Sequence, residues 1–185
     1  MTRRLSALVL IGPLLLVSPL LLVGCVGGIG TAPNPEGPPV SSGVEVEGDG
    51  WSATFPGEVE QRVDPFPLPE LGLELDAKLA VWENDTDALV VQFVEFPATE
   101  ADQAAVLLET AAAAGDVVDS PALDGDGTFQ GRDAVVVSAV QQGADLQLLA
   151  FLDGARLYQI IHVSSDPATE HNELVLLADS FAFRP

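Results

Sequence analysis

The single cysteine, Cys25, is the residue whose type and position most clearly indicate a chemistry. It follows Leu22-Val23-Gly24 at the end of an apolar run that begins after Arg3 and Arg4. A basic start, an apolar core and small residues before the cut are typical of an export signal. With a thiol directly after the cut, the pattern is that of a bacterial lipoprotein. We therefore expect cleavage between Gly24 and Cys25, and a diacylglyceryl group on the Cys25 sulfur.

The same apolar run is about long enough to cross a bilayer, so an uncleaved signal anchor is the alternative. Pro13, Pro19 and Gly12 make it a poor permanent helix. Two acyl chains on Cys25 would hold the protein stably to a membrane, whereas one chain would not. The sequence therefore predicts a lipid-anchored protein on the extracytoplasmic face of the cell membrane, with the bilayer as its first partner.

Two histidines are the candidates for acid–base chemistry. His162 lies in an expected strand and His171 near the start of an expected helix. Ser138, Ser164 or Ser165 could complete a Ser-His-Asp site, but the chain has no Gly-x-Ser-x-Gly elbow. We interpret both histidines as packing residues and expect no enzyme activity and no catalytic residue. A weak His-dependent hydrolase is the alternative.

The segment Asp124–Asp133 begins like a calcium-binding loop, with oxygen-bearing side chains at alternate positions. Phe129 stands where the sharp turn needs glycine, and Val135 where the bidentate acid should be. The segment is therefore interpreted as a solvated turn, and neither a metal nor a cofactor is expected. A calcium-dependent structural module remains as an alternative.

The net charge of −21 excludes one class of partner. Loss of Arg3 and Arg4 with the leader would leave five basic and 28 acidic side chains, and Lys78 is the only lysine. Such a surface repels nucleic acids and anionic lipid headgroups. Nucleic-acid binding is accordingly not expected.

Composition divides the chain into three parts. Residues 1–24 form the leader, and 25–50 form a tether rich in Gly, Pro and Ser without apolar periodicity. Residues 51–185 have the length of a single domain with its own core.

Within 51–185, hydrophobic periodicity predicts strands, then a helix, then more strands and a last helix. A short strand is expected at 51–55 and a hairpin from 73–82 and 89–96, followed by a helix that Thr99 caps. Three strands at 134–140, 146–152 and 156–163 precede a helix that begins at Asp166-Pro167. Short turns between consecutive strands indicate an antiparallel sheet with helices packed on it, an α+β fold.

Two stretches resemble the PsbP-like group of bacterial lipoproteins. One is Trp51-Ser-Ala-Thr-Phe-Pro-Gly57; the other runs from Asp153-Gly-Ala-Arg-Leu-Tyr-Gln-Ile-Ile161 to Ala178-Asp-Ser-Phe-Ala-Phe183. The resemblance covers most of 51–185 and implies an α/β/α sandwich that binds or assists other proteins. It supplies no catalytic residue. We therefore expect a non-enzymatic binding or assembly-assisting module for an envelope protein or component.

The apolar, proline-constrained segment around Phe66-Pro67-Leu68-Pro69 is the candidate partner contact. Phe66, Leu68 and Leu71 are its large apolar residues. If it were a loop on the surface, these side chains would be free to meet another protein.

Overall fold

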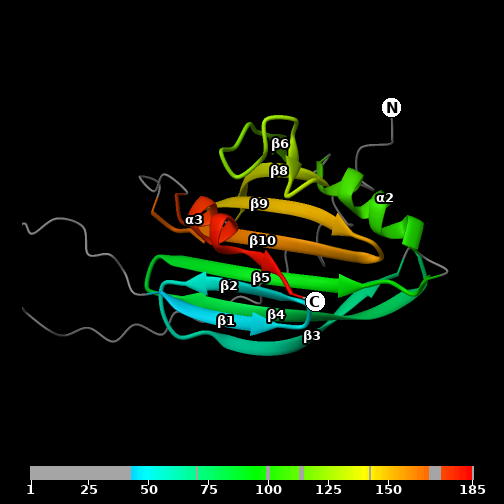
Figure 1. Cartoon of the computed structure of the whole chain (residues 1–185), viewed down its shortest axis with the longest axis horizontal. Coiled ribbons are helices and arrows are strands. Elements are labelled where there is room, and N and C mark those ends of the chain that lie inside the picture. The colour runs from blue at the N-terminus through cyan, green and yellow to red at the C-terminus, as the bar shows by residue number, and fades with distance from the viewer. Residues whose placement is uncertain are drawn as a thin grey trace, which may run out of the picture.

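The computed structural model describes residues 43–69, 71–98, 101–112, 115–141, 143–166 and 172–184. Antiparallel strands dominate this part of the chain (Figure 1). The large sheet has the order β3-β4-β5-β10-β9-β8-β6, with β7 added beside β8, and a second sheet has the order β1-β2-β11. Two helices are described. Within the described residues, no helix has the length and apolar character needed to cross a membrane.

The elements follow one another along the chain with short connections. They are β1 (Val44–Gly48), β2 (Trp51–Phe55), β3 (Glu60–Leu68), β4 (Leu73–Glu83), β5 (Asp87–Glu95), α2 (Ala101–Ala112), β6 (Asp116–Val117), β7 (Thr128–Phe129), β8 (Arg132–Gln141), β9 (Ala144–Asp153), β10 (Arg156–Ser164), α3 (Asn172–Ser180) and β11 (Ala182–Phe183).

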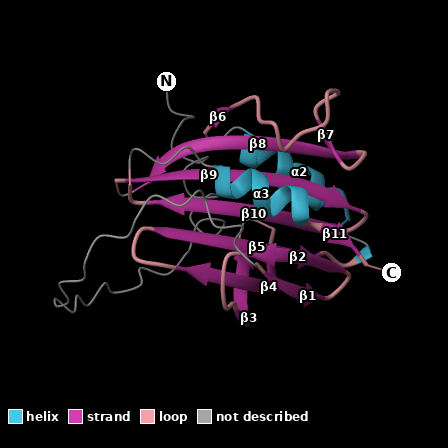
Figure 2. Ribbon diagram, turned by 60° about the vertical axis from the view of Figure 1, so that its left-hand side comes forward, coloured by secondary structure: helices cyan, strands magenta, loops and turns pink. Residues whose placement is uncertain are grey.

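Successive side chains of the large sheet point to opposite faces. On one face, here called the aromatic face, Phe93, Phe151 and Tyr158 pack beneath α3 and the small sheet. The other face, here called the aliphatic face, carries Leu157 and Ile161 of β10. Helix α2 packs its buried residues onto part of the aliphatic face. Figure 2 shows the small sheet and α3 lying over the large sheet.

The expected α/β/α sandwich is wrong, because the fold is built mainly from strands. Eleven strands accompany the two helices in the described part of the chain. On the aromatic face, the small sheet occupies much of the layer that a helix was expected to fill. Two short helices are too little to form a layer on each face of a sheet with eight strands.

Two strands account for most of the difference. Strand β1 falls in the segment expected to be tether, and β3 includes the segment expected to be a loop. The sequence of β1 is short and acidic, and β3 contains Pro65 and Pro67. Both are edge strands, where proline and charge are tolerated.

The remaining expected elements are present. The hairpin of β4 and β5, the three strands β8, β9 and β10, and the strand at 51–55 occur close to their expected bounds. The first expected helix is present as α2, and its apolar residues Ala104 and Leu107 are buried. The last helix is described from Asn172, so its expected start at Pro167 lies outside the described residues, as does the Thr99 cap.

Candidate functional site: a groove between the two sheets

An open groove of about 370 Å³ lies where the β1–β2 hairpin crosses the β3–β4 edge of the large sheet. This volume is at the lower end of the range of ligand sites. Strand β1 and its turn contribute 47–49, β3 contributes 61–63, and Lys78 and Phe93 come from β4 and β5. The groove therefore depends on segments from both sheets.

Charged side chains form a balanced cluster at one end of the groove. Asp49 Oδ2 lies 2.6 Å from Lys78 Nζ, and Asp49 Oδ1 lies 3.9 Å from Arg156 Nη2. Arg156 Nη2 also lies 3.1 Å from Glu95 Oε2. The hydrogen bond from Lys78 and the attraction of both cations lower the pKa of Asp49, outweighing a small opposing effect of burial. The carboxylate is therefore ionised at neutral pH, and two cations are matched by two anions.

The same two cations lie over an aromatic ring. Lys78 Nζ is 5.3 Å and Arg156 Cζ 5.4 Å from the centre of the Phe93 ring. Tyr158 stacks on Phe93 with the ring centres 5.3 Å apart. Burial raises the pKa of Tyr158, although the hydrogen bond with Arg156 acts against it. The Phe93 ring at the base of the groove is thus packed against Tyr158 and lies beneath two cations that Asp49 and Glu95 neutralise.

A side-chain amide joins the two sheet edges. Gln61 Nε2, on β3, donates to the backbone carbonyl oxygen of Glu47, on β1, over 3.1 Å. Val63, two residues along β3, remains 58 % exposed beside this contact. The groove therefore lies between two strand edges that no strand joins in the described part of the chain.

His162 is buried and does not line the groove. Its side chain is fully buried, and its Nε2 lies 3.3 Å from Asp87 Oδ1. Ser138 lies on β8, separated from β10 by β9, and Ser164 Oγ accepts a hydrogen bond from the Asp166 backbone. His171 lies outside the described residues. His162 and Ser164 both contact Asp87, in a buried cluster whose residues do not line the groove.

The hydrogen bonds that Asp87 accepts predict that the stability of the fold depends on pH. Burial acts to raise the pKa of Asp87, but hydrogen bonds from Thr86, Ser164 and His162 outweigh it and lower the pKa below the usual 3.8. A lowered folded-state pKa contributes stability above pH 3.8 that is lost as the pH falls through the folded value.

We therefore expect the difference in melting temperature between wild type and Asp87→Asn to shrink as the pH is lowered from 6 towards 3. Asp85→Asn, an exposed acid two residues away, is the matched control. Thermal unfolding followed by circular dichroism across this range measures both. A difference that stays constant with pH would contradict the assignment to Asp87.

The acidic loop at 124–128 is closed by its own hydrogen bonds. The Thr128 backbone oxygen accepts from the Asp124 N–H over 2.7 Å, and Thr128 Oγ1 donates to Asp126 Oδ1 over 2.7 Å. Hydrogen bonds from Thr128 lower the pKa of Asp126. Among the described residues, no group of three or more His, Cys, Asp or Glu side chains is placed to hold a metal ion. The geometry adds no support for a calcium module.

The expected partner contact at Phe66, Leu68 and Leu71 is not a free surface. Phe66 and Leu68 are almost fully buried against the aliphatic face, in a cluster with Leu107 of α2. Leu71 is half-buried beside them. The contact prediction is therefore corrected: these side chains are core, because β3 alternates and turns Phe66 and Leu68 inward. Gly24 and Cys25 lie outside the described residues.

Sequence reasoning did not identify the groove. One signal was present, since Lys78 is the only lysine in a strongly acidic chain. Its partners Asp49 and Phe93, and the second cation Arg156, are far apart in sequence and come together only through sheet pairing and the crossing of the hairpin. Comparison of the chain with protein-family models, curated proteins and solved structures finds no match.

Proposed function

We propose that this chain is a lipid-anchored, extracytoplasmic binding module without enzymatic activity, and that the groove between the two sheets is where it binds an envelope protein or component. The groove carries the proposal, because it combines an open volume, exposed apolar surface and a rigid charged base. Binding sites commonly unite these features. The PsbP-like resemblance points to the same kind of role and stays a prediction.

The anchor and the charge support this role from the sequence. An acylated Cys25 would anchor the chain to the membrane. The tether that follows would hold the domain at a short distance from the membrane surface. A net charge of −21 favours basic partners over nucleic acids and anionic lipids. These properties suit a protein that meets its partner beside the membrane.

Photo-crosslinking in native membranes tests the binding site. A photoreactive amino acid at Val63, in the groove, is expected to capture one reproducible partner. The same amino acid at Val140 is the control, since Val140 is an exposed valine at 73 % but lies on β8, outside the groove. Equal capture from both positions, or none from Val63, would overturn the groove as the binding site.

Lipidation gives a separate expected result. Full-length wild type should carry the mass of an acyl-modified N-terminus and remain with the membrane fraction, whereas Cys25→Ser should lack that mass and be lost from the fraction. Intact-mass spectrometry and membrane fractionation measure this. Masses that differ only by the substitution itself would refute the anchor.

A further inference from the structure

We propose that the free edge of β1 binds an extended peptide segment that alternates basic and apolar side chains and adds to the small sheet as a new strand. This rests on the proposed function and names the partner class for the same groove. Strand addition is a common mode of peptide recognition, in which backbone hydrogen bonds supply affinity and alternate side chains supply specificity.

The register of the β1–β2 hairpin determines which backbone groups are free. Gly48 pairs with Trp51 beside the two-residue turn, and Val46 pairs with Ala53. Pairs flanking a two-residue turn exchange hydrogen bonds, and this alternates along an antiparallel ladder. The N–H and C=O groups of Glu45 and Glu47 therefore point away from β2, toward the free edge.

The neighbouring edge of β3 is blocked over half its length. Proline cannot donate to a ladder, so Pro65 and Pro67 turn their nitrogen atoms to the free side and prevent strand addition there. Such prolines are a usual protection of sheet edges. The half that contains Gln61 and Val63 has no proline, and this is the half that lines the groove. The prolines therefore prevent strand addition along the part of β3 outside the groove, and the part that lines the groove lacks this protection.

The Gln61 side chain makes the hydrogen bond to β1 that the backbone of a bound peptide would make. Its carboxamide has the same chemical groups as a peptide bond, and its N–H group donates to the outward carbonyl of Glu47 over 3.1 Å. A bound strand would place its own backbone N–H at this oxygen. The Gln61–Glu47 contact thus marks an edge position that accepts a peptide-like donor.

Side chains around the edge indicate the composition of the peptide. Glu45 and Glu47 are both exposed and two residues apart, so they lie on one face of β1. Glu45 Oε1 already pairs with Arg184 Nη2 over 2.7 Å, whereas Glu47 makes no ion pair among the described residues. A residue opposite Glu47 in an added strand would share that face, where a basic side chain is favoured. Val46, between the two glutamates, turns inward. The residues of the peptide between its basic positions should therefore be apolar.

The probe is a fluorescent heptapeptide in which lysine occupies positions one, three, five and seven and valine the others. Binding is measured by anisotropy to the full-length protein in nanodiscs of neutral phosphatidylcholine, which does not attract lysine. Two further peptides are matched controls: one with glutamate for lysine, and one N-methylated at alternate residues to remove the hydrogen-bonding edge. Only the unmodified lysine peptide is expected to bind.

Three variants separate backbone pairing from charge. Glu47→Pro removes an outward N–H that β2 does not use, and is expected to weaken binding about tenfold or more. Glu47→Gln keeps the N–H, and should weaken binding less than about threefold. Gln61→Ala frees the Glu47 carbonyl, and should strengthen binding by about two- to tenfold.

Equal binding of the unmodified and N-methylated peptides would overturn the proposal, because it would indicate charge attraction alone. Absence of lysine-peptide binding would overturn it as well. Should Glu47→Pro fail to fold, the N-methylated peptide still tests backbone pairing on the wild type. Capture of a partner at Val63 together with no peptide binding would leave the groove as the site and reject strand addition.

Discussion

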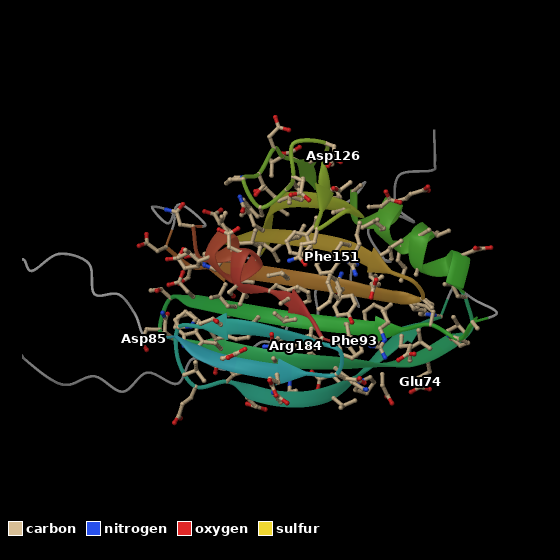
Figure 3. All side chains as sticks on the ribbon, in the orientation of Figure 1. Glu74, Asp85, Phe93, Asp126, Phe151 and Arg184 are labelled. Carbon is tan, nitrogen blue, oxygen red and sulfur yellow. The ribbon has the colours of Figure 1, made fainter. Side chains whose placement is uncertain are left out.

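Replacing Phe151 with alanine is expected to lower the free energy of unfolding by about 3–5 kcal/mol. The side chain is fully buried on the aromatic face, with Phe129, Tyr158 and Phe181 at 4.7, 5.3 and 5.5 Å between ring centres. Truncation would remove burial and these three ring contacts together. The three rings come from β7, β10 and the connection between α3 and β11, which limits their collapse into the cavity. Figure 3 shows Phe151 and Phe93 in the interior and Glu74, Asp85 and Asp126 at the periphery.

Chemical denaturation of wild type and variant measures the loss. Phe183→Ala is the control, since Phe183 is only partly buried and contacts the same cluster from the edge, with its ring 6.0 Å from that of Phe151. A smaller loss is expected there. A loss below about 2 kcal/mol for Phe151→Ala would show that the aromatic layer is not what joins the small sheet and α3 to the large sheet.

The second large effect is expected at a pair of buried glutamines on the aliphatic face. Gln92 Nε2 donates to Gln159 Oε1 over 3.0 Å, and Gln159 is fully buried. Gln159 Nε2 has no hydrogen-bond partner in the described part of the structure. Gln92→Leu should therefore destabilise the fold by about 1–3 kcal/mol, because it leaves both polar atoms of the buried Gln159 amide unsatisfied.

The double variant Gln92→Leu/Gln159→Leu should recover this loss, because both partners are replaced by apolar groups of similar size. A double-mutant cycle from denaturant unfolding measures the coupling, expected at about 1–3 kcal/mol. Additive losses would contradict a coupled pair. If the double variant is as stable as wild type and still binds the lysine peptide, the pair serves neither the fold's stability nor the groove.

Much of the strand content could be predicted from the sequence. Apolar residues alternate with charged ones from Leu73 to Lys78, and this pattern, with the polar residues at 83–87, predicted the β4–β5 hairpin that the structure contains. Gly154 predicted the turn between β9 and β10, and its φ of 63° shows why glycine is needed there. Such local signals do not depend on what packs on the sheet.

Edge strands and layers were harder to predict. β3 carries two prolines and β1 two acids, so neither looks like a central strand, yet both are accommodated because one side of each is unpaired. The interpretation of Phe66 and Leu68 as surface contacts followed from the missed strand. Once β3 pairs with β4, its alternation turns both side chains into the core.

The sequence by itself determined the strongly acidic surface, the two amphipathic helices, the central antiparallel strands and the lipoprotein prediction at Cys25. These follow from composition or from periodicity over a few consecutive residues. Only the tertiary structure decided that a second sheet covers the aromatic face, and that Asp49, Lys78, Phe93 and Arg156 meet at a groove beside two strand edges. The reason is physical: these contacts join residues tens of positions apart, and packing between sheets brings them together without leaving a local pattern in the chain.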